Sequence, residues 1–389
     1  MDYGRRQLRP AVGWLYLAMF IAVGFALSLL GPSLTYLRER AHVSKGTIGV
    51  LFAAQSLGYL LGALLSGRFY DRGAGHRAVA GALAGLAGTA LLIPHATSVL
   101  ALCVPFALIG CFAGCLDVGG NVLVVWHSRR TGSSQLLNAL HLFFGIGAVL
   151  TPPLVNRSLA YSHGLGIAAG LLAGYALVIA VLALMHSAPE PGVVAGQTTQ
   201  VFAPTRILGV IGFFFFLYVG VEVGFSGWIK TYAEGLHLPG IDTPTWLNTA
   251  FWVCFTLGRL IATILSKRIR PGRLLFGSCA ASVALLMVMV AADGQIAAVW
   301  ITTILLGFAL APQFASMIAY AEERITLSGR STSWFISASG IGGLLLPWLI
   351  GSLIDRSGSG AMPLTVLAAA IASTAWLLVV RRQLARNFA

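Results

Sequence analysis

Long apolar segments recur from one end of this sequence to the other, and they limit the folds that the chain can adopt. Each is about 20 residues long, the length that an α-helix needs to cross a hydrocarbon core about 30 Å thick. A chain that is 57% hydrophobic and 10% charged also has too little polar surface for a water-soluble domain. The sequence therefore predicts an all-α integral membrane protein.

We count twelve predicted transmembrane helices in the 389 residues. Their expected bounds are 12–36, 46–66, 78–95, 98–126, 135–156, 164–186, 206–230, 245–266, 274–293, 295–321, 331–354 and 361–380. The polar start, MDYGRRQLRP, precedes an apolar run that is too long for a signal peptide and has no small-residue cleavage site. We therefore expect this run to be retained as the first helix.

The formal net charge of +13 is the balance of 25 Lys and Arg residues against 12 Asp and Glu residues, and most of the Lys and Arg residues fall on connections that share one side of the membrane. This asymmetry follows the positive-inside rule if both termini are cytoplasmic. It explains the charge without a nucleic-acid partner, so we expect none. We expect a multi-pass protein of the cell (inner) membrane. The five cysteines lie in predicted spans without His or acidic partners at metal-binding spacing, so we expect no metal site.

Three segments of the first half recur, in order, in the second half. The pattern F..VG......G...TY from Phe20 recurs from Phe216, LGYLLGALLSGR from Leu57 recurs as LGRLIATILSKR, and GIGAVLTP from Gly145 recurs as GIGGLLLP. Six helices per repeat is an even number, so the halves are parallel and related by an axis along the membrane normal. We predict a six-helix half at 1–186, a polar cytoplasmic linker at 187–205 and a second half at 206–389.

This layout resembles the major facilitator superfamily over nearly the whole chain. The loop GRFYDRGAGHR is similar to a loop motif of that superfamily, and Gly67, Asp71, Arg72, Gly75 and Arg77 hold the matching positions, with one residue inserted. The charge of Asp71 suggests a pairing with an arginine or a helix end across the boundary between the halves, which breaks when the halves rock. The alternative is a solvated pair of loop charges. A looser copy, GSLIDRSG, ends the eleventh helix on the outer side.

Three further segments resemble the fucose–proton symporter family and its sodium-dependent glucose transporter branch. They are DVGGN at 117–121, NALHLFFGIGAVLTPP at 138–153 and LYVGVEVGFSGW at 217–228. The resemblance implies that a carboxylate on the fourth helix couples transport to a cation, a role that Asp117 would take. The Gly-Pro signature of proton-driven antiporters is absent from the fifth helix, which argues against efflux.

Polar residues at similar depth in the first half form a candidate site. A charged residue deep in a span costs about 2.5–3.5 kcal/mol, so Asp117 requires a partner, water or a cation. Asn121 lies one turn from Asp117, and Asn138 and His141 share a face of the fifth helix. We predict binding roles for these residues and cation coupling at Asp117; the alternative is a buried, hydrogen-bonded structural cluster.

Arg259 stands where the first repeat has Tyr59, so the second half carries a charge that the first lacks. It is a possible partner for Asp117, an anchor for an anion at the membrane surface, or a side chain that extends to that surface.

Glu222 lies about 24 Å along the seventh helix from Arg206, past the membrane midplane. Its counterpart in the first repeat is Ala26, so the carboxylate is not part of the repeated scaffold. An acid near an aromatic ring suits a sugar, and we therefore predict substrate contacts from Glu222 and Trp228. Glu222 is the alternative cation site, or else a structural carboxylate. Gln313 and Trp334 complete the predicted lining.

These features predict a secondary active transporter that moves a small polar solute, most simply a monosaccharide, by alternating access coupled to H⁺ or Na⁺. The alternatives are an exporter of amphipathic drug-like or lipid substrates, and a non-transporting scaffold or receptor. No Walker loop or hydrolase motif occurs, so we expect no enzyme activity. We expect a monomer whose partners are the solute and the lipid bilayer, with no cofactor beyond the coupling cation.

Overall fold

The computed structural model describes residues 10–73, 75–127, 134–162, 164–189, 205–236, 242–325 and 329–387. These residues form helices and connecting turns, without a strand. Within the described residues, twelve helical segments are long and apolar enough to cross a membrane. The predicted all-α class with twelve spans is confirmed.

The first six spans contain eight α-helices, because two spans are divided. The helices are α1 (Pro10–Ser28), α2 (Leu30–Ala41), α3 (Lys45–Ile48), α4 (Val50–Asp71), α5 (Gly75–Leu92), α6 (Val99–His127), α7 (Ser134–Ser162) and α8 (Gly166–Met185). The first span breaks at Leu29 because Pro32, which has no N–H, leaves the carbonyl of Ser28 without its helical hydrogen bond. Ser44 accepts a hydrogen bond from the backbone N–H of Thr47 (3.2 Å) and so caps α3.

The last six spans contain seven α-helices. They are α9 (Thr205–Gly235), α10 (Thr243–Leu265), α11 (Pro271–Ala291), α12 (Ile296–Leu310), α13 (Gln313–Glu322), α14 (Gly329–Ser357) and α15 (Ala361–Asn387). The tenth span divides at Pro312, where the missing N–H again interrupts the helix. The Tyr218 hydroxyl donates to the Leu310 carbonyl (3.2 Å) beside this break and compensates for part of the lost bonding.

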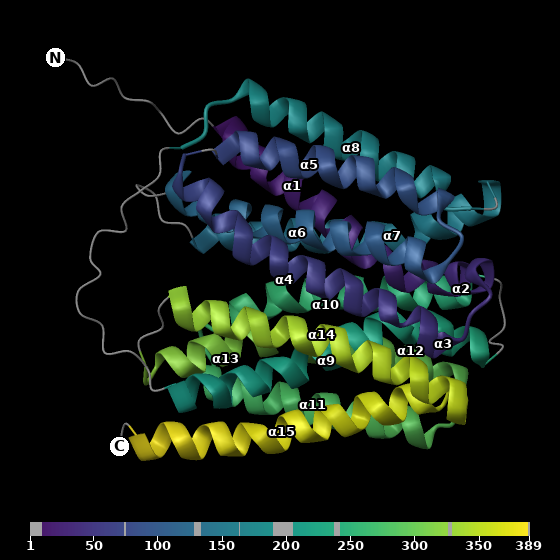
Figure 1. Ribbon diagram of the computed structural model, residues 1–389. Coiled ribbons are helices and arrows are strands. Elements are labelled where there is room, and N and C mark those ends of the chain that lie inside the picture. Colours follow the sequence, from purple (N-terminus) through teal and green to yellow (C-terminus); the bar gives the residue numbers. More distant parts are fainter. Residues whose placement is uncertain are drawn as a thin grey trace.

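Figure 1 shows that α1–α8 lie on one side of the bundle and α9–α15 on the other. Both described ends of the chain, the start of α1 and the end of α15, lie at the same end of the bundle, which we call the termini end. The connection between α2 and α3 lies at the opposite end, which we call the distal end. The predicted domain bounds at 186, 187–205 and 206 stay a prediction, because residues 190–204 lie outside the described part of the chain.

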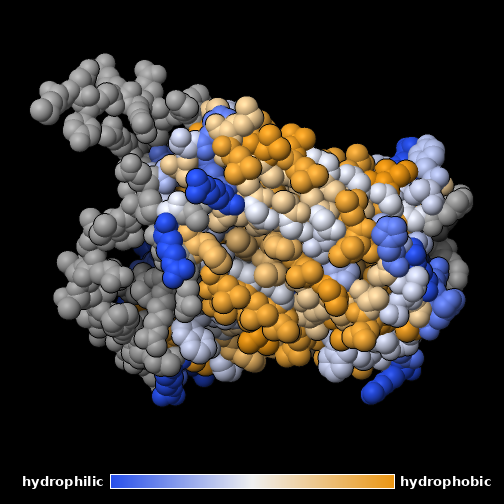
Figure 2. All heavy atoms as spheres, turned by 45° about the horizontal axis from the view of Figure 1, so that its top comes forward, coloured by the Kyte–Doolittle hydropathy of each residue, from blue (hydrophilic) through white to orange (hydrophobic). Residues whose placement is uncertain are grey.

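The surface is apolar around its middle and hydrophilic toward both ends on the face that Figure 2 shows. Large hydrophobic side chains are exposed along the spans, including Leu100 (80%), Leu64 (56%) and Ile301 (56%). An exposed apolar belt of this extent is expected where lipid, not water, surrounds the protein.

Candidate functional site

Asp117 is held by two neutral hydrogen-bond donors. Its carboxylate accepts a hydrogen bond from the Tyr59 hydroxyl of α4 and one from the Asn121 amide at 3.2 Å. The same amide also donates to the backbone carbonyl of Asp117 (2.9 Å). Sequence reasoning paired Asp117 with Asn121, which the structure brings together, but did not find Tyr59. Neutral donors orient the carboxylate and leave its charge uncompensated.

Close packing of α4 on α6 explains how Tyr59 reaches Asp117. A Cβ on Gly58 would overlap the backbone carbonyl of Ala107, and a Cβ on Gly114 would overlap the carbonyl of Tyr59. Only glycine permits this approach of two helix backbones. The short distance between the helices then lets the tyrosine side chain span it.

Arg259 links the polar residues of four helices. Its positive charge acts on Asp117 of α6, His141 of α7 and Glu222 of α9. The guanidinium also lies over the ring of Phe255, 4.6 Å from the ring centroid, an arrangement that favours a cation. Arg259 is therefore within electrostatic range of three other residues that the sequence singled out, but no ion pair within 4 Å joins it to any of them.

Three charged or titratable side chains are partly accessible to solvent although protein atoms surround them. They are Asp117, His141 and Glu222. Isolated charges in a packed interior are costly, whereas charges that line an accessible interior surface are typical of transport pathways. The three side chains are thus placed where a solute or an ion can reach them.

Tyr218 lies one helical turn before Glu222 in α9, and its hydroxyl donates to the Leu310 carbonyl. Tyr218 borders a small cavity that is also lined by Ser282, Gln313 and Ser373. Gln313 is only 3% exposed and donates to Ser282 (2.9 Å), so it lies within the α9–α15 group. The Ser373 hydroxyl has no hydrogen-bond partner among the residues that the structure describes. A polar cavity therefore adjoins Glu222 through Tyr218, and Gln313 belongs to that cavity.

The two predicted aromatic residues lie in different surroundings. Trp228 is fully buried; its indole N–H donates to the Pro347 carbonyl (2.8 Å) and its ring packs on Phe52. Trp334, near the start of α14, is 53% exposed. The side chain of Asn138 lies outside the described residues. Binding roles for these three residues stay predictions.

The loop motif after α4 is described only in part. Gly75 begins α5 and is buried against Ala188, whereas Arg72 and Arg77 are exposed. The structure does not describe the surroundings of Gly67 or the side chain of Asp71, so the expected pairing of Asp71 stays a prediction.

The looser copy of that motif makes a contact that is described fully. Asp355, near the end of α14, accepts hydrogen bonds from the backbone N–H groups of Lys45 (2.8 Å) and Gly46 (2.5 Å) at the start of α3. A carboxylate at a helix N-terminus complements the helix dipole. The contact joins the two sides of the bundle at the distal end.

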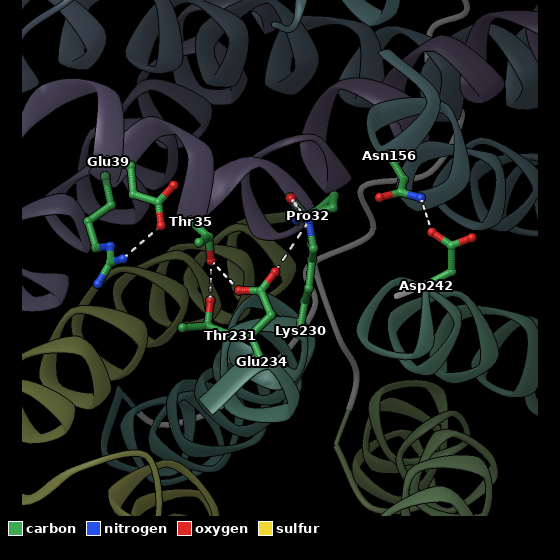
Figure 3. Close-up of polar contacts among 9 residues, drawn as sticks. Pro32, Thr35, Glu39, Asn156, Lys230, Thr231, Glu234 and Asp242 are labelled. Carbon is green, nitrogen blue, oxygen red and sulfur yellow. Dashed lines mark hydrogen bonds and ion pairs between the residues drawn. The ribbon is translucent and has the colours of Figure 1, made fainter. Parts of the chain in front are cut away.

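A hydrogen-bonded network joins α2 to α9 at the same end (Figure 3). The Thr35 hydroxyl donates to the Glu234 carboxylate (2.5 Å) and lies 3.4 Å from the Thr231 hydroxyl. The Lys230 ammonium donates to the Pro32 carbonyl (2.7 Å) and lies 3.7 Å from the Glu234 carboxylate. Both partners of this charge pair belong to α9.

Asn156 of α7 completes the distal contacts by donating to Asp242, which precedes α10 (2.6 Å). Six hydrogen bonds between described residues of α1–α8 and of α9–α15 or the turn before α10 lie at this end. The distal end is therefore fastened. Sequence reasoning missed Lys230 and Glu234, although the repeat pattern did contain Thr35 and Thr231 and the looser copy of the loop motif contained Asp355.

This arrangement is typical of a membrane transporter: two helical halves with polar groups between them and hydrogen bonds that join the halves at one end. The comparison with known families identifies the family. Residues 16–347 match the profile described as Major Facilitator Superfamily. The chain belongs to this superfamily. It is accordingly a multi-pass membrane transporter and not an enzyme, as predicted.

Several known proteins are similar along most of the chain. Sodium-dependent glucose transporter 1A of Mus musculus is 26% identical over 377 residues, covering 86% of this chain and 88% of the relative. Sodium-dependent glucose transporter 1 of Homo sapiens is 25% identical, covering 86% and 72%. Major facilitator superfamily domain-containing protein 4A of Homo sapiens is also 25% identical, covering 91% and 88%.

Solved structures support the same fold. The nucleoside transporter NupG has a TM-score of 0.73 at 14% identity, covering 97% of this chain and 98% of that one. FucP in its outward conformation has a TM-score of 0.66 at 19% identity, covering 96% and 98%. At these identities the likeness concerns the fold alone.

Proposed function

We propose that this transporter carries a monosaccharide together with H⁺ or Na⁺. The observation that carries the proposal is the Asp117 carboxylate, which keeps accessible surface and is held by the neutral donors Tyr59 and Asn121. Such a group gains most from binding a cation. The names of the sodium-dependent glucose transporters that are similar along most of the chain support a sugar as the solute.

The distal contacts support alternating access for this transport. Transport requires a second state in which the Thr35–Glu234 and Lys230–Pro32 hydrogen bonds are broken. Each broken bond joins a charged group of α9 to a neutral group of α2, and Lys230 keeps Glu234 as its partner. Opening therefore leaves no isolated charge, which keeps the energetic cost low.

The placement in the cell follows from the charge distribution. We propose the cell (inner) membrane, with the termini end in the cytoplasm, because most Lys and Arg residues lie on that side. We also propose a monomer that needs no cofactor besides the coupling cation. Light scattering of the purified protein tests the monomer, and reporter fusions at either terminus test the orientation.

Uptake into proteoliposomes tests the transport itself. Purified protein is given radiolabelled D-glucose with an inward Na⁺ gradient, an inward H⁺ gradient or neither. We expect accumulation with one of the two gradients and its loss in Asp117→Asn, which should still exchange internal for external sugar. An absence of D-glucose uptake and exchange in the unaltered protein would contradict the proposal. Export of an amphipathic dye would favour the alternative function instead.

A further inference from the structure

The charge pair of α9 is completed by neutral groups of α2. The Lys230 ammonium donates to the Pro32 carbonyl (2.7 Å). The Glu234 carboxylate accepts a hydrogen bond from the Thr35 hydroxyl (2.5 Å). The two charged groups lie 3.7 Å apart, and their residues are one helical turn from each other (Figure 3). Helix α2 therefore supplies this pair with one acceptor and one donor, both neutral.

Both charges of this pair belong to the second half alone. In the register of the repeat, Lys230 falls on Leu34. Glu234 falls on Arg38, which has the opposite charge. The pair is therefore not part of the repeated scaffold. Because both of its members lie on α9, they stay together when α2 and α9 separate, and each loses one neutral partner.

The first half covers the face of α9 that carries this pair. Lys230 and Thr231 are each only 6% exposed. A Cβ on Gly227 would overlap the ring of Phe52 of α4. Gly227, Thr231 and Glu234 follow one another at spacings of four and three residues, so they share a face of the helix. Separation of the halves at the distal end uncovers this face.

A solute with neighbouring hydroxyl groups can replace both groups of α2. A hydroxyl both donates and accepts hydrogen bonds. One hydroxyl can therefore accept from the ammonium in place of the Pro32 carbonyl, and the next can donate to the carboxylate in place of Thr35. Hydrogen bonds to charged groups are also stronger than those between neutral groups.

We infer that Lys230 and Glu234 form an outer binding subsite for two neighbouring hydroxyl groups of the solute when the distal end is open. This inference rests on the proposed transport of a sugar. The subsite is separate from the polar residues deeper in the bundle, because Lys230 lies eight residues, about 12 Å, beyond Glu222 along α9.

Competition by the monodeoxy derivatives of D-glucose tests the subsite. Each derivative lacks one hydroxyl and competes with radiolabelled D-glucose for uptake into vesicles whose distal end faces the medium. In the unaltered protein, loss of either of two neighbouring hydroxyls should weaken competition at least about tenfold. In the double variant Lys230→Met/Glu234→Gln this penalty should fall below about twofold, because the charged partners are absent.

Thr35→Val is the matched control. It removes the donor on α2 and weakens the closed contact, but it leaves the charge pair of α9 intact. The ratio between a derivative and D-glucose does not depend on how often the distal end is open, because that fraction scales both apparent affinities equally. Thr35→Val should therefore keep the tenfold penalties while it lowers the D-glucose concentration for half-maximal uptake.

Cysteine labelling gives a second test that keeps both charged residues. Thr231→Cys lies in the subsite, whereas Asn156→Cys lies at the distal end beside Asp242, and both are made without the five native cysteines. Saturating D-glucose should slow labelling by a membrane-impermeant maleimide at least about fivefold more at Thr231→Cys than at Asn156→Cys, because bound solute covers the subsite.

The same hydroxyl penalties in the unaltered protein and the double variant would overturn the inference. Equal effects of D-glucose at the two labelling sites would also overturn it, and this comparison decides if the double variant does not fold. An unaltered protein that moves no D-glucose would instead contradict the proposed function, so the two failures are distinguishable.

Discussion

The hydroxyl oxygens of Thr35 and Thr231 lie 3.4 Å apart, and these residues occupy the same position in the two repeats. Gly31 and Gly227, another repeated pair, also meet, since a Cβ on Gly31 would lie 3.2 Å from the Cα of Gly227. Equivalent residues of two repeats contact each other where the symmetry axis passes between them. The axis that relates the halves therefore runs through the fastened distal end.

A disulfide between Thr35→Cys and Thr231→Cys should lock the distal end closed. The hydroxyl separation places the two side chains within reach of the disulfide geometry. We expect oxidation to stop D-glucose uptake and reduction to restore it, measured in a background without the five native cysteines. Each single variant serves as a control and should be insensitive to oxidant. Uptake that continues with the disulfide formed would argue against movement at this end.

Glu234→Gln should destabilise the protein more than Lys230→Met. The lysine side chain is 8% exposed and would lose its only charged partner in that pair, whereas the glutamate is 30% exposed and is solvated when left alone. We expect a loss of about 3 kcal/mol for Glu234→Gln and about 1 kcal/mol for Lys230→Met. Melting temperatures in detergent check the order. The double variant should recover part of the loss, and purely additive losses would contradict the pairing.

Tyr59→Phe should shift the cation dependence of uptake to lower concentration. The variant removes one hydrogen bond to the Asp117 carboxylate, worth about 1.5–3 kcal/mol for a charged acceptor, while its ring still fills the same volume. A bound cation competes with this hydrogen bond, so we expect half-maximal uptake at a cation concentration at least about tenfold lower. An unchanged concentration would show that the coupling cation binds elsewhere.

Asp355→Ala should favour opening of the distal end. The side chain accepts hydrogen bonds from the N–H groups of Lys45 and Gly46, and loss of such a cap costs about 1 kcal/mol. Labelling of a cysteine at Thr35 by a membrane-impermeant maleimide should therefore speed up about fivefold. Arg356→Gln, at the neighbouring exposed residue, is the matched control and should not change labelling. Equal labelling in both variants would exclude a fastening role for Asp355.

Gly114→Ala should destabilise the protein, whereas Gly88→Ala should not. A Cβ at Gly114 overlaps the Tyr59 carbonyl, but a Cβ at Gly88 meets nothing within 4 Å. Overpacking costs about 1–3 kcal/mol, while alanine at an open helical site stabilises by up to about 1 kcal/mol. Thermal melting of the two variants compares the effects directly. Because Gly114 positions Tyr59, its variant should also alter the cation dependence of uptake.

The sequence by itself determined the membrane spans, the repeat and the candidates for chemistry. Helix length and hydropathy identify a span because the hydrocarbon thickness sets both. A charge in such a span stands out because its cost is high, which is why Asp117, Glu222 and Arg259 were found without a structure. The loop motif and the repeat then indicated the superfamily.

Only the tertiary structure decided which faces meet. A helix that is apolar on every side carries little information about its rotation, so the sequence did not pair Tyr59 with Asp117 or set Trp228 apart from Glu222. These contacts depend on how closely glycines let the backbones approach. The distal contacts of Lys230 and Asp355 likewise join residues far apart in the chain. Periodicity within one helix does not encode such partners, because they form only when both halves pack together.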